Sequence, residues 1–199
     1  MTSATEANVP FTHNDIDIGS HLVQALVHHA TSTQGQPIGY SDLLTQARAM
    51  HPKDAVLDRA VPVGIGTKLL FVASFCAAHG YPNLACLAVN RNTMLPAPGY
   101  AGDWQAERRA VAGADWSLVN ERLLAYASTV HATVPARLKP RKERPADVAW
   151  YAYFCSHRSA CEKITQEDKK EIINLIMAGL DPDTALKRVV AAKADFSEA

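Results

Sequence analysis

Apolar residues recur at spacings of three and four along much of the chain, and this spacing predicts amphipathic helices. The first such stretch runs from Asp15 to about Ala30, with Asn14 or Asp15 as its cap. A later one begins near Val63 and is expected to end at Gly80. The helices predicted before residue 135 cover about 15–30, 41–47, 63–79, 104–111 and 117–131.

Two short stretches between these helices are typical of strands. Ile38 and Tyr40 suit one short strand, and the apolar run "LACLAV" at 84–89 suits a buried one. The segment "NRNTMLPAPG" at 90–99 then turns the chain towards a weakly marked return strand. The resulting order is helix, strand, helix, helix, strand, turn, which is that of a winged helix-turn-helix. We therefore expect a mostly helical α+β fold with a winged helix-turn-helix core and a C-terminal helical hairpin.

Composition changes divide this plan into segments. Residues 1–12 are small and polar and predict a flexible tail, and 13–134 form the winged-helix-like domain with its extra helices. A basic, proline-rich linker is expected at 135–147, followed by a helical C-terminal subdomain at 148–199. In that subdomain Thr165 with Asp168 predicts one helix start, and Asp181 with Pro182 predicts another.

The overall charge excludes a protein that is basic throughout. The chain of 199 residues has a formal net charge of +0, so nucleic-acid binding would have to use a local basic patch. The four cysteines are too sparse for a disulfide framework, and no hydrophobic leader segment is visible. The longest apolar run, Leu69–Ala78, is too short to span a bilayer. We expect a cytoplasmic protein without a membrane segment.

Residues Ile38–Gly102 resemble the winged-helix domain of the methylated-DNA alkyltransferases and alkyltransferase-like proteins. The resemblance is carried by "YSDLL" at 40–44, "VGIGTKL" at 63–69, "ACLAVN" at 85–90 and "PGYAG" at 98–102. It implies duplex DNA as the ligand, a helix start at the DNA backbone and a wing. The family's intercalating arginine is replaced by Val63. Its activating histidine and the following arginine are replaced by Leu87 and Ala88.

Cys86 is the residue that would carry alkyl-transfer chemistry. A nucleophilic thiol needs a base, a cation or a helix terminus to favour its thiolate, and Cys86 is flanked by apolar residues that raise its pKa instead. We expect it to fill a core, and the sequence leans against an enzyme. Cys155, His157 and Cys161 lack the ligand number and spacing of a zinc site. No metal or cofactor is predicted.

The candidate DNA contacts are polar residues near the proposed helix starts, the turn and the basic linker. They are Tyr40, Ser41, Thr67, Lys68, Arg91, Arg137, Lys139, Arg141, Lys142 and Arg144. In the linker the cations either follow a phosphate backbone or only keep a solvated connection extended, and both interpretations stay open.

Three functions follow, in order of preference. The first is a non-enzymatic, winged-helix DNA-binding or DNA-associated accessory protein. The second is an interaction protein, of the kind encoded by phages and plasmids, that binds and modulates another protein. Here the aromatic "WYAYF" of the C-terminal helices, at 150–154, would offer a surface for a protein partner or a homodimer. The third is an alkyltransferase or another cysteine enzyme.

Overall fold

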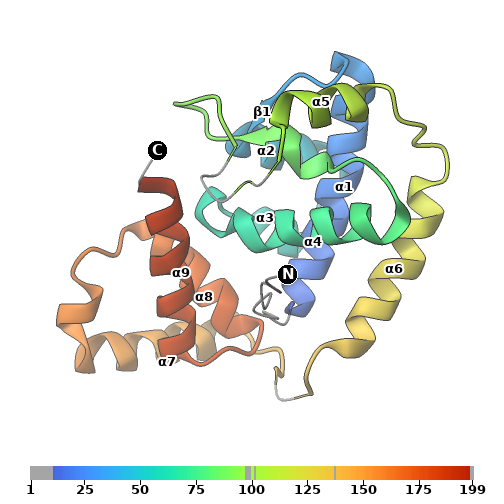
Figure 1. Cartoon of the computed structure of the whole chain (residues 1–199). Helices are drawn as coiled ribbons and strands as arrows, with labels where there is room; N and C mark the ends of the chain where they lie inside the picture. Colours follow the sequence, from blue (N-terminus) through green and yellow to red (C-terminus); the bar gives the residue numbers. More distant parts are fainter. Residues whose placement is uncertain (1–10, 97–99, 101, 137, 198–199) are drawn as a thin grey trace, which may run out of the picture.

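A computed structural model describes residues 11–96, 100, 102–136 and 138–197, and these form a mostly helical α+β protein (Figure 1). Labels with η denote 3-10 helices. The elements are α1 (His13–Thr33), β1 (Ile38–Gly39), α2 (Tyr40–Met50), α3 (Ala55–Arg59), η1 (Pro62–Gly64), α4 (Ile65–His79), η2 (Leu84–Leu87), β2 (Ala88–Val89), α5 (Trp104–Ala112), α6 (Val119–Thr133), α7 (Glu143–Ser156), η3 (Arg158–Cys161), α8 (Gln166–Met177) and α9 (Pro182–Ser197).

The helix α1 starts earlier than the apolar spacing indicates, because Thr12 rather than Asn14 or Asp15 is its cap. Thr12 and Asp15 form a capping box, in which the Thr12 side chain accepts from the Asp15 N–H and the Asp15 carboxylate accepts from the Thr12 N–H. Phe11 packs edge-on against Phe71, with ring centroids 5.7 Å apart. The end of the predicted tail is therefore packed, whereas its residues 1–10 lie outside the described residues.

The helix α4 crosses α1. It supplies many of the buried apolar side chains in the part of the protein before residue 135. Phe71 and Phe75 are fully buried, and a Cβ at Gly19 would lie only 2.6 Å from Phe71, so glycine permits this close crossing. Gly80 ends α4 in the left-handed conformation (φ 68°), as predicted. The stretch Pro62–His79 is long and apolar enough to cross a membrane, by length and composition alone. It is longer than the apolar run Leu69–Ala78 on which the sequence-based expectation rests. In this structure α4 packs against α1, and the buried Lys68 of α4 forms a salt bridge with Glu171.

The strand predicted at 84–89 is wrong over its first four residues, which form the 3-10 helix η2. The side chain of Asn83 accepts from the N–H of Ala85, and Trp104 Nε1 donates to the carbonyl of Cys86 at 2.7 Å. These bonds satisfy backbone groups that a strand would have offered to a neighbour. Only Ala88 and Val89 remain extended, and they pair in parallel with Ile38 and Gly39. No return strand follows in the described part of the chain.

The C-terminal helices α7, α8 and α9 enclose a second group of buried side chains, which includes Trp150 and Ile172. The predicted starts of α8 at the Thr165–Asp168 capping box and of α9 at Pro182 are confirmed. The predicted linker is too long, because α7 begins at Glu143. Pro145 does not prevent this, since a proline in the first helical turn gives up an N–H that has no helical partner.

Two histidines meet where α1 lies against the end of α2. The rings of His21 and His51 have centroids 4.1 Å apart, and His21 Nε2 lies 3.1 Å from a carboxylate oxygen of Asp54. Burial, with the charge of a protonated His21, lowers the pKa of His51 below its ordinary value of 6.5, against the opposing effect of Asp54.

This depressed pKa predicts a pH dependence of stability. The unfolded chain takes up the His51 proton at a higher pH than the folded chain, so the free energy of unfolding falls as the pH drops through about 6.5. Denaturant titrations of wild type and His51→Gln between about pH 7.5 and about pH 5.5 would measure this; the variant should show a weaker dependence. His28→Gln, at an exposed position of α1, is the control. An equal dependence in wild type and His51→Gln contradicts the assignment.

Candidate nucleic-acid interface

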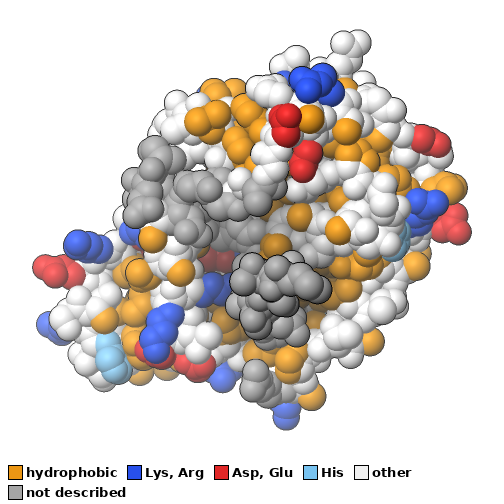
Figure 2. Space-filling model, in the orientation of Figure 1, with side chains coloured by type: hydrophobic (Ala, Val, Ile, Leu, Met, Phe, Trp, Pro, Cys, Tyr) orange, Lys and Arg blue, Asp and Glu red, His pale blue; other side chains and the backbone are white. Residues whose placement is uncertain are grey.

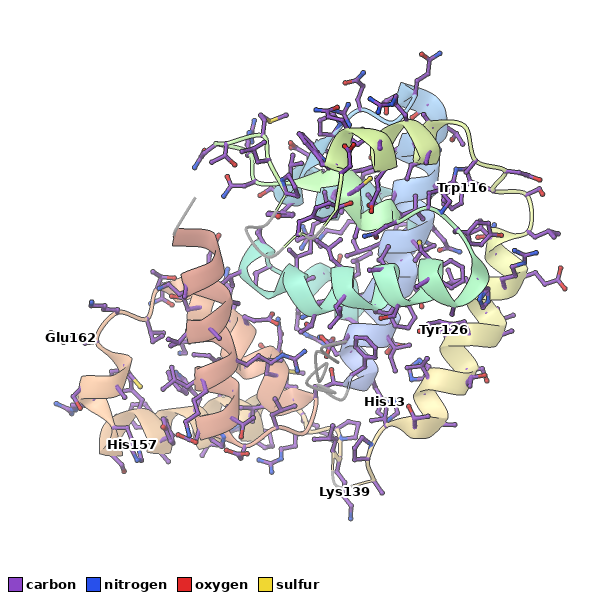
Figure 3. All side chains as sticks on the ribbon, viewed as in Figure 1. His13, Trp116, Tyr126, Lys139, His157 and Glu162 are labelled. Atoms are coloured by element: carbon purple, nitrogen blue, oxygen red, sulfur yellow. The ribbon has the colours of Figure 1, made fainter. Side chains whose placement is uncertain are left out.

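Four of the predicted phosphate contacts surround the start of α7. Lys139, Arg141, Lys142 and Arg144 are all exposed, and none of their side chains forms a salt bridge with a described residue. We call Lys139–Arg144 the basic segment. Arg137, predicted to belong with them, lies outside the described residues. Figure 3 shows Lys139 at the lower edge of the molecule, where the chain passes from α6 to α7.

The backbone adds to the positive potential of the basic segment. Lys142 caps α7 without a side-chain hydrogen bond, so the first N–H groups of the helix have no side-chain acceptor there. The helix macrodipole favours anions at this end. The N–H of Arg141 donates to the carbonyl of Met177 at 2.7 Å, which fixes the segment on the end of α8. A fixed, exposed group of cations at an open helix start suits a phosphate backbone.

The start of α2 and the turn after β2 form a second group of predicted contacts. Tyr40 is buried, with 6% of its surface exposed, whereas Ser41 and Arg91 are exposed. The turn is closed by two hydrogen bonds, from Asn90 N–H to the carbonyl of Leu95 and from Met94 N–H to the carbonyl of Asn90. Tyr40, Ser41 and Arg91 line one hollow of about 300 Å³. The structure thus brings these three predicted residues together.

Thr67 and Lys68, predicted to face DNA from α4, instead point into the protein. The Thr67 hydroxyl donates to Asp15 Oδ1 at 2.8 Å. Lys68 is 2% exposed, and its Nζ lies 2.8 Å from Glu171 Oε1 and 3.4 Å from Asp15 Oδ1. The prediction that Lys68 is available to a phosphate is therefore wrong in this structure. A buried lysine must be paired, and two carboxylates already take its charge.

Asp15 is the centre of a buried network that joins the helices before residue 135 (α1 to α6) to the C-terminal helices (α7 to α9). We call these the two groups of helices. Arg188 from α9 places its Nη2 2.8 Å from Asp15 Oδ2. Burial alone would raise the pKa of Asp15, but the charges of Lys68 and Arg188 outweigh it and hold that pKa well below its usual range. Burial likewise would lower the pKa of Lys68, yet Glu171 and Asp15 raise it. Asp15 and Lys68 therefore stay charged at neutral pH.

The position of Lys68 in the sequence is one signal of this network. Lys68 follows Ile65 by three residues and precedes Val72 by four, so it lies on the apolar face of its helix. A lysine on such a face requires a buried carboxylate partner. Its nearest partner, Glu171, is far away in the sequence, and no local pattern identifies it.

Hollows that share lining residues lie along the seam between the helices before residue 135 and the C-terminal helices α7 to α9. One, of about 740 Å³, lies between α2, α3 and η1 on one side and α7 and α8 on the other. It shares Ser41 and Glu167 with the hollow that contains Arg91. Its lining includes the basic residues Arg48, Arg59 and Lys170 and the acidic residues Asp58, Glu143 and Glu167. This mixture gives no strongly positive field, and Figure 2 shows basic and acidic side chains interspersed on the face drawn.

Three of the four cysteines are buried. Cys86 is fully buried, and burial, followed by the charge of Glu107, raises the pKa of its thiol to about 12. A thiol with this pKa is not a nucleophile at neutral pH. Cys161 is buried and Cys155 exposed, while His157 Nδ1 lies 3.0 Å from the carbonyl oxygen of Tyr153. Within the described ranges no three histidine, cysteine or acidic side chains are placed to hold a metal ion.

Comparisons with protein-family models, with curated proteins and with solved structures found no match for this chain.

Proposed function

We propose that the protein is a non-enzymatic DNA-binding or DNA-associated accessory protein that contacts the phosphate backbone of duplex DNA. The observation that carries this proposal is the basic segment, with four exposed cations and no salt bridges among the described residues, at the open start of α7. Each such cation that reaches a phosphate releases a condensed counterion and so adds salt-dependent affinity. The basic segment supplies a local positive charge, which the chain as a whole lacks because its net charge is +0.

The proposed winged-helix arrangement consists of α2, α4 and the turn after β2, with Arg91 as the wing contact. In this arrangement α4 would be the recognition helix, yet its Thr67 and Lys68 are held by Asp15 and Glu171. Base reading needs polar groups that reach the groove, whereas phosphate contacts only position the protein. We therefore propose binding with little sequence preference, through the basic segment and Arg91.

Neutralising the basic segment tests the proposal. The triple variant Arg141→Gln, Lys142→Gln, Arg144→Gln should bind a fluorescent random duplex at least about tenfold more weakly than wild type at low salt. Fluorescence anisotropy measures this affinity. The variant should fold normally, because none of these side chains forms a salt bridge with a described residue.

A matched control separates a local effect from the change in net charge. The variant Lys53→Gln, Arg109→Gln, Lys163→Gln removes the same charge from exposed positions elsewhere and should retain wild-type affinity. Equal weakening in both variants would show that the binding does not depend on the basic segment. Wild type that fails to bind duplex even at low salt would overturn the proposal.

A second candidate function, an interaction protein, is favoured by the outer face of α7. Val148 and Tyr151 are 61% and 68% exposed, although Trp150 on the same helix is buried. An exposed apolar stripe with an aromatic residue is a feature of protein-protein contacts. The absence of duplex binding in the experiment above would favour this function.

A further inference from the structure

A small hollow lies where four separate segments of the chain meet at one end of the seam. It has a volume of about 190 Å³ and is bordered by the start of α1, the end of α3, the approach to α7 and the end of α8. Its polar lining residues are His13, Asn14, Asp17, Arg59, Arg141 and Asn174. Figure 3 labels His13 at the start of α1, close to where α6 ends.

Two arginines in this hollow have no acidic partner among the described residues. The guanidinium groups of Arg59 and Arg141 form no salt bridge there. Both backbones are nevertheless fixed, since the Arg59 carbonyl accepts from Asn174 at 3.0 Å and the Arg141 N–H donates to Met177. Arg59 and Arg141 both line this one hollow. Two guanidinium groups held close together repel each other unless an anion lies between them.

The one carboxylate of the hollow is already occupied. Asp17 Oδ1 lies 3.0 Å from His131 Nε2, and the Nδ1 atoms of His131 and His13 are 2.9 Å apart. This chain of contacts holds the Asp17 carboxylate towards α6. Asn14 adds a side-chain amide that has no partner among the described residues. The hollow therefore offers two guanidinium groups and an amide, which are donors suited to an oxyanion.

The size of the hollow limits its ligand. Sites that enclose whole small molecules have volumes of about 300–1,000 Å³, so this one suits a single phosphate group and not a complete nucleotide. It shares Arg59, Asn174 and Met177 with the hollow of about 740 Å³, whose walls include the apolar Leu44 and Ile173. A ligand with its phosphate in the small hollow can extend its organic part into the large one.

We propose that the seam binds a phosphomonoester, with the phosphate between Arg59 and Arg141 and the organic part in the large hollow. This site differs from the basic segment in Arg59, which lies outside that segment, and overlaps with it in Arg141. The phosphate can belong to a free mononucleotide or to the 5′ end of a DNA strand, and both present the same dianion to the two guanidinium groups.

Calorimetric titration with inorganic phosphate and with adenosine 5′-monophosphate, at constant ionic strength, tests this site. Both should bind saturably, and the nucleotide at least about fivefold more tightly because its organic part buries surface in the large hollow. Arg59→Gln should weaken both at least about tenfold. Arg109→Gln, an exposed arginine of α5, should leave both unchanged. No saturable binding of either probe, or wild-type binding by Arg59→Gln, would overturn the proposal.

A second set of variants keeps the site distinguishable from duplex binding. Arg59→Gln should retain affinity for a duplex with 5′-hydroxyl ends, whereas Lys139→Gln should bind the duplex more weakly than wild type and retain phosphate binding. If Arg59→Gln unfolds, Arg141→Gln replaces it in the phosphate titration. A 5′-phosphorylated duplex that binds more tightly than the 5′-hydroxyl duplex, only with Arg59 present, identifies the strand end as the source. Equal binding of the two duplexes, with the nucleotide bound, identifies a free mononucleotide.

Discussion

Asp15→Asn is expected to lower the free energy of unfolding by about 3–5 kcal/mol, the range observed when one partner of a buried ion pair is removed. Asp15 is 0% exposed and accepts from Thr12, Thr67 and Arg188, with Lys68 also within ion-pair distance. An asparagine keeps the shape but not the charge, so it leaves Arg188 without its carboxylate. It also leaves Lys68 with only Glu171.

Urea titrations of Asp15→Asn and of Asp17→Asn measure this effect. Asp17 lies one half-turn further along α1, has a side chain that is 45% exposed and pairs with His131. Its replacement should change stability by less than about 1 kcal/mol, as for exposed pairs. A change of the same small size in Asp15→Asn would show that the network does not join the two groups of helices.

Gly64→Ala is expected to lower the free energy of unfolding by about 1–3 kcal/mol through overpacking. A Cβ at Gly64 would lie 2.1–2.4 Å from the carboxylate atoms of Glu171. The Gly64 backbone, with φ −91°, is open to any residue, so only the contact with Glu171 opposes the substitution. Glu171 cannot withdraw without abandoning Lys68, its buried partner. Chemical denaturation followed by circular dichroism measures the change.

The control for this variant lies two residues along the chain. At Gly66, within α4, a Cβ would meet nothing within 4 Å. Gly66→Ala should therefore raise the free energy of unfolding by about 0.5–1 kcal/mol, because alanine is favoured over glycine inside a helix. If both variants are stabilised, Glu171 does not occupy the space beside Gly64.

The sequence predicts the ends of a helix correctly where the residues that fix the end are its close neighbours in the chain. The capping box at Thr165, the proline at the start of α9 and the glycine after α4 each act within one helical turn. The run at 84–89 suits a strand in the sequence, because a short apolar run has no periodicity that separates a strand from a tight helix. Its conformation depends on a hydrogen bond from Trp104, which is distant in the sequence.

The sequence predicts the candidate site only where lysines and arginines are so crowded that their side chains must be exposed. The crowded cations of the basic segment are exposed as expected, since several lysines and arginines cannot be buried together without acidic partners. Lys68 is the opposite case, because its two carboxylate partners come from α1 and α8. The hollow between Arg59 and Arg141 likewise depends on the packing of distant segments, for which one sequence contains no local signal.

The proposed function requires the basic segment at the start of α7 to bind the phosphate backbone of duplex DNA. The most direct test is the slope of log affinity against log salt for a random duplex, measured for wild type and for the Arg141→Gln, Lys142→Gln, Arg144→Gln variant. Each phosphate contact contributes about −0.9 to this slope, so loss of three should reduce its magnitude by about 2.7. A wild-type slope that the variant leaves unchanged would contradict the claim.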